Sequence, residues 1–495
     1  MKSAAEQVKP MTSPRTGPKP MPYEDHFKIS RDDLEKILET ALSRGGDFAE
    51  IFLEYQLYEF INMEDDIIKE TAETVSLGMG IRVLSGDQTG YGYTSDLSLD
   101  SIRKTALTAG SVAVSGGRSR AKRPTAGSLE TGGPCHNLYP VLRPSHAASM
   151  QAKIRLVREA YLAAQHFDPG IKKVKASYQG SLKHISIVNS EGVNVRDVRP
   201  QIRLVCAAIA EKGGERESGY CGGGGRVGLE YFRTRLTPRQ IGEEAAREAV
   251  NLLEAIDAPA GEMPIVLSPG HSGVLIHEAV GHLLEADFNR KKTSIFWNKM
   301  GKKVGSEKVT IYDDPTIPSS RGSYNVDDEG TRPRKTLLVE KGVVKGWLQD
   351  RLSARLMKLP LTGHGRRQDY ACWPLPRMSN TYIEKGEYAA EEIIKSVKKG
   401  FYVDRLQGGQ VEDSGKFTFS VSSGFLIEDG KLTAPVKQAT LIGSNVDVLK
   451  KIEMVGGDLE FGLQTGTCSK EGQDVPVNDG CPTMKISRMT VGGRE

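Results

Sequence analysis

Two histidines flank a glutamate in the stretch 271-HSGVLIHEAVGHLLEADF-288, and residues of these types can hold a metal ion. The histidines, His277 and His282, are five positions apart, and Glu278 directly follows the first. In the HExxH arrangement of zinc peptidases, histidines four apart lie on one face of a helix and the glutamate activates water on the metal. The stretch therefore predicts metal-assisted hydrolysis, provided that a spacing of five can bring the two imidazoles together.

A spacing of five does not fit a regular α-helix. Positions five apart are rotated by roughly 140° there, because each residue turns the helix by about 100°. A π-bulge inserts one residue into a turn and is favoured at functional sites, and it would return His277 and His282 to one face. Gly281 lowers the local helix propensity and would ease this distortion. We therefore expect a π-helical break between the two histidines.

The surroundings of the pair favour a metal site over two ordinary core histidines. Glu278 lies within the otherwise apolar LIHEAVGHLL, where a carboxylate is costly unless it has a partner or a task. Glu285 and Asp287 follow closely and are suited to accept hydrogen bonds from the ring N–H groups of metal-bound histidines. The spacing by itself leaves open the alternative that both histidines pack on the apolar face of a buried helix.

The elements that must position this stretch follow from apolar periodicity. Ser30 is a suitable N-cap for a helix that ends before Gly45, and residues 49–95 alternate apolar and polar side chains in runs typical of antiparallel hairpins. The run 219-GYCGGGGRVG-228 lacks the Lys-Ser/Thr of a phosphate loop, so we expect a flexible hairpin tip there. Further helices are predicted at 99–114, 150–166 and 238–256, with strands across 174–211.

These elements predict an α+β protein in three parts. Residues 1–28 have no apolar period and are predicted to be a disordered tail. Residues 29–258 are predicted to form an N-terminal domain of antiparallel sheets layered with helices, and a Gly- and Pro-rich loop near 115–148 would divide it into two subdomains. The predicted β-rich C-terminal catalytic domain, 259–495, begins with a short buried strand and the histidine-bearing helix.

Composition argues against several classes of partner. The formal net charge is only +4 and the Lys and Arg residues are dispersed, so no footprint for nucleic acid or an anionic membrane is present in the sequence. No stretch approaches the roughly 18–20 apolar residues of a membrane span, and the N-terminus lacks the apolar core of a signal peptide. We therefore expect a cytoplasmic protein whose six cysteines are thiols, among which a special one is a ligand or a nucleophile.

The sequence resembles the TldD/PmbA family, and within it the TldD branch, which keeps the metal motif that the TldE/PmbA branch lacks. The resemblance covers nearly everything after the tail and includes EDDIIKETAETVSLGMGIRVLSGDQTGYGYTSD near the N-terminus. It is carried mainly by HEAVGHLLEADF at 277–288, GHGRRQDYACWPLPRMSNTYI at 363–383, VSSGFLIEDGKLTAPVKQATLIGSN at 421–445 and TCSKEGQDVPVNDGCPTMKISRMTVGG at 467–493.

The resemblance implies a zinc-dependent peptidase that acts on small, unstructured or modified peptides. It also implies a TldE/PmbA-like partner subunit or a self-dimer that encloses the site. The zinc ligands implied are His277, His282 and Cys468, the last in TCSKEGQ, where Ser469 replaces the usual glycine. From residue types alone, other candidates for the third ligand serve nearly as well: Cys372, Cys481, His271, His364 and Glu285.

In this hypothesis Glu278 is the general base that takes a proton from water and passes it to the leaving amine. The candidates for a donor that stabilises the oxyanion are His364, Arg366 and Tyr370. An extended peptide would add to a sheet edge through main-chain hydrogen bonds, which favours unfolded substrates. Two alternatives stay open, namely a non-catalytic peptide-binding subunit and a metal-dependent amidase.

Overall fold

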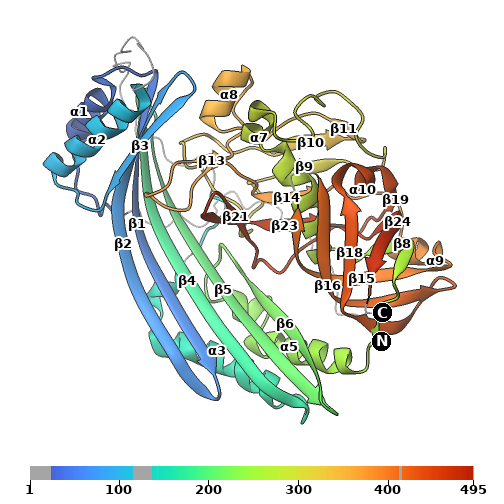
Figure 1. The fold of residues 1–495 in the computed structure, drawn as a ribbon. Coiled ribbons are helices and arrows are strands. Elements are labelled where there is room, and N and C mark those ends of the chain that lie inside the picture. The colour runs from blue at the N-terminus through green and yellow to red at the C-terminus, as the bar shows by residue number, and fades with distance from the viewer. Residues whose placement is uncertain (1–23, 115–136, 142, 412–414, 494–495) are drawn as a thin grey trace, which may run out of the picture.

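The protein is of the α+β class, as the sequence predicts, and contains two large sheets that face each other across a region of short strands and loops (Figure 1). The structure is a computed structural model that describes residues 24–114, 137–141, 143–411 and 415–493. Of the expected tail at 1–28 only residues 24–28 are described, and most of the expected loop near 115–148 lies outside the described residues.

The N-terminal sheet has six antiparallel strands in the order β3-β2-β1-β4-β5-β6, four of them 17 to 19 residues long. The hairpin turn between the first two strands uses Asp65 and Asp66, which both have positive φ. The bounds are β1 Phe48–Glu64, β2 Ile67–Ser85, β3 Gln88–Thr94, β4 Ile171–Asn189, β5 Asn194–Lys212 and β6 Glu215–Gly225, with helices α1 Arg31–Leu42, α2 Leu99–Val114, α3 Met150–Gln165, α4 Tyr231–Thr234 and α5 Pro238–Leu253 and a 3-10 turn at Ser145–Ala147.

The two faces of this sheet have different tasks, because successive side chains of a strand point to opposite sides. On β1, Ile51 and Leu53 pack with α1 and α2, and Ile61 and Met63 pack with α3 and α5. The intervening positions of β1, such as Phe52, face the C-terminal half of the chain. One face is thus covered by helices, and the other is free to contribute polar side chains to an interface.

The glycine run is not a hairpin tip, contrary to the expectation from sequence. Residues 215–225 form β6, and the turn before it is made by Gly213 and Gly214, both with positive φ. The glycines of β6 are required for close packing: a Cβ on Gly219 would lie 2.1 Å from the carbonyl oxygen of Ala245 in α5, and one on Gly224 would lie 2.1 Å from that of Ile202 in β5. The small size of Gly219 lets α5 lie directly on the strand, and that of Gly224 allows the close approach of β5.

The C-terminal half is rich in strands, as predicted. An eight-stranded sheet has the order β15-β8-β24-β18-β16-β17-β7, with β19 paired to β24, and a six-stranded sheet has the order β11-β10-β9-β14-β23-β20. The bounds are β7 Ile256–Asp257, β8 Gly261–Leu267, β9 Ile311–Asp313, β10 Thr336–Glu340, β11 Val343–Val344, β12 Gly365–Arg366, β13 Leu375–Pro376, β14 Asn380–Ile383, β15 Lys399–Val411, β16 Lys416–Glu428, β17 Lys431–Lys437, β18 Ala439–Ser444, β19 Ile452–Val455, β20 Glu460–Phe461, β21 Thr467–Lys470, β22 Gln473–Pro476, β23 Asn478–Cys481 and β24 Met484–Gly492, with helices α6 Val274–Ile276, α7 Ala286–Lys291, α8 Arg351–Met357, α9 Ala390–Lys395 and α10 Asn445–Lys451.

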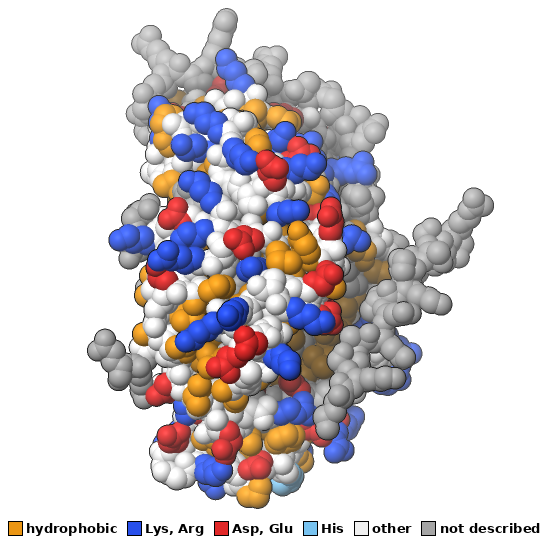
Figure 2. Space-filling model, turned by 90° about the vertical axis from the view of Figure 1, so that its right-hand side faces the viewer, with side chains coloured by type: hydrophobic (Ala, Val, Ile, Leu, Met, Phe, Trp, Pro, Cys, Tyr) orange, Lys and Arg blue, Asp and Glu red, His pale blue; other side chains and the backbone are white. Residues whose placement is uncertain are grey.

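No helix within the described ranges is long and apolar enough to cross a membrane. The face of the molecule on the side of β24 carries Lys and Arg side chains interspersed with Asp and Glu side chains (Figure 2). This mixed surface agrees with the dispersed charge of the sequence.

Buried ion pairs join the N-terminal sheet to the C-terminal half. Arg82 on β2 contacts Glu50 on β1 at 2.8 Å and Glu329 at 2.6 Å, and all three side chains are at most 1% exposed. Arg367 also pairs with Glu50. Burial raises the pKa of Glu329 to about 7, although Arg82 opposes this. The interface therefore depends on charges that water does not solvate.

We expect Arg82→Met to destabilise the protein by about 3–5 kcal/mol, because it leaves two buried carboxylates with fewer cationic partners. Urea unfolding monitored by circular dichroism measures the effect. The matched control is Arg239→Met, which removes a 72% exposed arginine paired with Glu243 on the same helix and should change stability by less than about 0.5 kcal/mol. Equal effects of the two substitutions would contradict the role of the buried pairs.

Candidate metal centre

The helix that bears the histidines is irregular along its whole length. A 3-10 turn at His271–Gly273 leads into the short α6, followed by a π-helical segment at His277–Gly281 and a second 3-10 turn at His282–Leu284. The predicted π-helical break is thus present. Gly281 has an ordinary helical φ of −57°, and the space it leaves is filled by Met378, whose sulfur would lie 1.9 Å from an added Cβ. Close packing, rather than backbone freedom, explains this glycine.

The break brings the two imidazoles to one side of the segment. Their ring centroids are 5.2 Å apart, with the ring planes at 87°. Nδ1 of His277 is 2.8 Å from Oδ1 of Asp479, and Nδ1 of His282 is 3.1 Å from Oε2 of Glu285. A carboxylate that holds Nδ1 fixes the ring orientation and leaves Nε2 free to bind a metal, as in many histidine metal sites.

Cys468 approaches this pair from the hairpin β21–β22. Its Sγ is 3.4 Å from Nε2 of His282, and one donor atom from each of the three residues lies within 4.8 Å of the others. Residues alternate between exposed and buried along β21, which directs Cys468 inward and Ser469 outward. This is the one group of histidine, cysteine and carboxylate side chains with metal-site spacing that the described part of the chain contains.

Charge at the site favours the thiolate form of Cys468. Burial alone would raise the pKa of the thiol, but the neighbouring His277 and His282 outweigh that effect and hold the pKa well below its ordinary value. Thiolate is the form of cysteine that binds metals.

A shell of buried polar groups fixes the hairpin and the helix relative to each other. Lys470 lies two positions after Cys468 on the same strand. Its Nζ donates to Glu285 at 3.0 Å and to Asp287 at 2.8 Å. The guanidinium of Arg377, which is fully buried, donates to the carbonyl of Cys468 at 2.6 Å and to that of Gln473 at 3.1 Å. The bond from Lys470 thus connects Glu285, which orients His282, to β21, the strand that carries Cys468.

Three of the residues that support the site were not found from sequence, namely Asp479, Lys470 and Arg377. Asp479, rather than Asp287, accepts the second imidazole bond, and Asp287 instead binds Lys470. Asp479 is 202 positions from His277 and enters on β23, so no local pattern could have linked them. The alternation along β21 gives the one sequence signal for Lys470, since it places this residue on the same side as Cys468.

Glu278 lies beside the two histidines, on the side of Nε2 of His282 and not of the Nδ1 atoms that Asp479 and Glu285 bind. Its Oε2 is 3.8 Å from Nε2 of His282, and its side chain is 29% exposed. Burial raises the pKa of this carboxyl group, while His277 and His282 act in the opposite direction. The carboxylate thus reaches both the donor atoms and solvent.

The structure does not bring His364, Arg366 and Tyr370 into the group of donor atoms. His364 is fully buried and uses both ring nitrogens, on Asp313 at 2.9 Å and on Thr362. Arg366 donates to the carbonyls of Met378 and Pro476. The ring of Tyr370 packs on β2, where it fills the space above Gly78.

The other candidate ligands are also placed apart from the group. Sγ of Cys481, which is fully buried, donates to the carbonyl of Ser268 at 3.4 Å, and burial raises the pKa of this thiol. Cys372 lies in the loop with Asp369, and His271 is beside Gly462. Oε2 of Glu285 binds an imidazole and an ammonium group, and this residue is not in the group of three donors.

The donor set suits zinc. Zinc takes imidazole nitrogen at about 2.0–2.1 Å and thiolate sulfur at about 2.3 Å with tetrahedral angles, which places such a nitrogen and sulfur about 3.6 Å apart. The Nε2–Sγ distance of 3.4 Å between His282 and Cys468 is close to this value. Three protein donors also leave a fourth position open, as in catalytic rather than structural zinc sites.

Comparison with known proteins gives matches along almost the whole chain. Family models described as PmbA/TldA metallopeptidase domain 1, central domain and C-terminal domain match residues 49–113, 143–253 and 260–493. The metalloprotease TldD homolog of Buchnera aphidicola subsp. Acyrthosiphon pisum is 40% identical over 473 residues, which are 94% of this chain and 97% of that protein. A protein of Saccharolobus solfataricus called a zinc metalloprotease TldD homolog is 32% identical over 255 residues, 51% of this chain and 57% of its own length.

A solved structure has the same fold. The crystal structure of TldE from Thermococcus kodakarensis superposes with a TM-score of 0.73 at 20% identity, over 93% of this chain and all of that chain. The domain models and the close relative together show that the chain belongs to the PmbA/TldD family of metallopeptidases.

Proposed function

We propose that this protein is a zinc-dependent peptidase that hydrolyses small unfolded or modified peptides in the cytoplasm. His277, His282 and Cys468 hold the zinc ion, and Glu278 is the general base. The observation that carries the proposal is the approach of three zinc-type donor atoms to within 4.8 Å of one another, with a partly exposed carboxylate beside them. The family supports the peptidase class.

Each protein group has a defined part in the chemistry. Zinc, when bound, supplies a Lewis acid that polarises a carbonyl group and makes water a nucleophile near neutral pH. Oε2 of Glu278 accepts the proton of the attacking water and returns it to the leaving amine. Asp479 and Glu285 hold the two imidazoles in the orientation that presents Nε2. His364, Arg366 and Tyr370 lie outside the group of donor atoms, so none of them is assigned as an oxyanion donor.

Unfolded peptides suit the surroundings of the site. The hairpin β21–β22 forms a two-stranded sheet of its own, so each strand pairs with one neighbour and has one edge that is not in a ladder. An extended peptide can add to such an edge by main-chain hydrogen bonds that do not depend on side-chain identity. A peptidase of this kind needs restricted entry, and we propose that a TldE-like partner subunit or a second copy of the chain encloses the site.

The test is a cleavage assay on short unstructured peptides, with the chain alone and with a TldE-like partner, before and after treatment with a chelator. We expect cleavage that requires metal and is greatest in the assembled state. Re-addition of zinc should restore it. Cleavage that survives complete metal removal, or full activity in a strictly monomeric protein, would contradict the proposal. Hydrolysis of small amides without any hydrolysis of peptides would also overturn it.

A further inference from the structure

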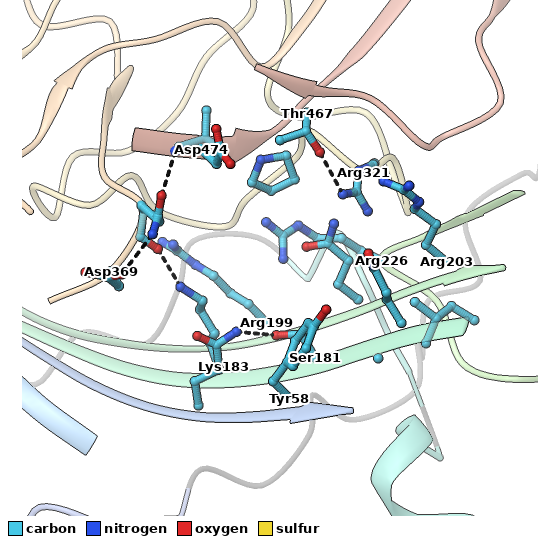
Figure 3. Close-up of a pocket in the computed structure, with 18 of the residues that line it drawn as sticks. Tyr58, Ser181, Lys183, Arg199, Arg203, Arg226, Arg321, Asp369, Thr467 and Asp474 are labelled. Carbon is cyan, nitrogen blue, oxygen red and sulfur yellow. Dashed lines mark hydrogen bonds between the residues drawn. The ribbon is translucent and has the colours of Figure 1, made fainter. Parts of the chain in front are cut away.

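A cavity of about 490 Å³ lies between the open face of the N-terminal sheet and the hairpin β21–β22 (Figure 3). Its floor includes Tyr58 of β1, Ser181 and Lys183 of β4 and Arg203 of β5. Its opposite wall includes Thr467 of β21, the residue directly before Cys468. Because neighbouring side chains of a strand point to opposite sides, the cavity and the candidate metal centre lie on the two sides of the same strand.

Four arginines of this cavity have no carboxylate partner among the described residues, namely Arg203, Arg226, Arg321 and Arg366. Their guanidinium groups donate instead to neutral oxygens: Arg203 to the carbonyl of Thr465 at 3.2 Å, Arg226 to those of Ser323 and Pro200, Arg321 to that of Gly466 at 2.7 Å and to the hydroxyl of Thr467 at 3.4 Å, and Arg366 to those of Met378 and Pro476. Nε of Arg203 is buried without any hydrogen-bond partner.

The burial of three of these cations without a carboxylate partner among the residues that the structure describes is energetically unfavourable. Arg226, Arg321 and Arg366 are at most 7% exposed. Burial, together with neighbouring arginines, lowers the pKa of Arg321 to about 9 and that of Arg226 to about 10. A buried charge is ordinarily paired, because burying it without a partner is unfavourable. A ligand that brings negative charge would relieve this cost.

The other cations of the cavity are paired with carboxylates, and two of its aspartates lie away from three of these four arginines. Arg199 pairs with Asp328, Arg367 with Glu50, and Lys183 with Glu54. Asp369 and Asp474 are at the other end of the cavity from Arg203, Arg226 and Arg321 (Figure 3). Three of the four arginines thus lie at one end of the cavity and two aspartates at the other, which disfavours a polyanion along its whole length and suits a ligand with one anionic group.

We propose that Arg203, Arg226, Arg321 and Arg366 bind a carboxylate of a peptide substrate. This inference rests on the peptidase function proposed above and adds a substrate class to it. Arginine binds carboxylates by paired, charge-assisted hydrogen bonds. The carboxylate comes either from the C-terminus of the peptide or from an acidic side chain, and the anchored peptide passes the end of the hairpin to reach the side that carries Cys468.

The test measures binding without turnover, in the Glu278→Gln protein loaded with zinc and assembled as in the cleavage assay. The probes are three N-terminally fluorescein-labelled pentaalanines: one with a free C-terminal carboxylate, one amidated, and one amidated with a central glutamate. We expect at least one carboxylate probe to bind about 10-fold or more tightly than the plain amide, because hydrogen bonds to charged groups contribute more than neutral ones. The stronger of the two identifies the source of the carboxylate.

Substitution then locates the effect. Arg203 is only partly buried, so Arg203→Met should fold, and it should reduce the preference for the carboxylate probe while leaving the affinity for the amidated probe unchanged. Arg203→Lys keeps the charge and should restore part of the preference. Arg239→Met, which changes an exposed arginine outside the cavity, should have no effect.

Three outcomes would overturn the inference: equal affinity for all three probes, an undiminished preference in Arg203→Met, or displacement of the carboxylate probe by inorganic phosphate at far lower concentration than by acetate. The last would assign the arginines to phosphate. The result is separable from the peptidase proposal, because a carboxylate preference that depends on Arg203 stands even if the wild-type protein cleaves none of the peptides.

Discussion

Replacement of Glu278 by glutamine is expected to lower kcat/KM for peptide cleavage by about 10²-fold to 10⁴-fold or more, the usual contribution of a general base, and to leave the metal content unchanged. Glutamine keeps the size of the side chain and its hydrogen-bonding ability but cannot accept and return a proton. The carboxylate is 29% exposed and is not one of the three grouped donors, so its loss should not disturb their spacing.

Steady-state kinetics together with metal analysis of the purified protein measures both effects. Glu471→Gln is the matched control, because it is the same substitution on the turn of the hairpin that carries Cys468. Glu471 is 42% exposed, pairs with Lys291 and is not in the group of donor atoms. The control should retain wild-type activity. Loss of metal in step with loss of activity in Glu278→Gln would mean that Glu278 is a ligand rather than a base.

Replacement of Cys468 by alanine is expected to abolish activity and zinc binding together. It removes the thiolate from a site with only three protein donors, and two imidazoles then remain to hold the ion. The sulfur also contacts Nε2 of His282 at 3.4 Å, so the change removes a group that faces the histidines directly. Metal analysis and a zinc competition titration with a chromogenic chelator provide readouts that do not depend on turnover.

Two other cysteines give the matched controls. Cys481→Ala removes a thiol whose sulfur donates to a backbone carbonyl, and Cys372→Ala removes a partly exposed thiol beside Asp369. Both variants should keep their zinc. Full zinc occupancy in Cys468→Ala would refute the assignment of the third ligand and would direct attention to Glu285 and His271.

Local sequence patterns were sufficient for the features that depend on a few neighbouring residues. The spacing of five between His277 and His282 predicted the π-helical break, because the rotation per residue of a helix is fixed by its backbone hydrogen bonds. The alternation of residues 49–95 predicted the hairpins of β1, β2 and β3 for a similar reason. Glu285 was correctly predicted to bind the ring N–H of one of the histidines, and the structure shows that this histidine is His282, three positions away.

Other local patterns were ambiguous without knowledge of what packs against them. The glycine run at 219–225 looked like a turn, yet it is a strand pressed against α5, and only the presence of that helix decides between the two. His364 looked like a candidate for the active site, yet Asp313 and Thr362 occupy both of its ring nitrogens in the interior. A residue's type states what it can bind, and its neighbours in the fold decide what it does bind.

The sequence alone therefore determined the chemistry available at His277, Glu278 and His282, together with the local backbone that presents them. Residue types alone left several candidates for the third ligand, and the resemblance pointed to Cys468; the tertiary structure places its sulfur beside the histidines. Asp479 is 202 positions from His277 and is placed there by β23, which pairs with the distant strand β14. Cys468 is 186 positions from His282 and lies on a local hairpin, which Lys470 and Arg377 hold against the rest of the fold. The same holds for the four arginines of the cavity, which come from both halves of the protein. Periodicity arises from bonds between near neighbours, whereas such convergence arises from the order of strands in a sheet and from the packing of one sheet against another, which no short stretch encodes.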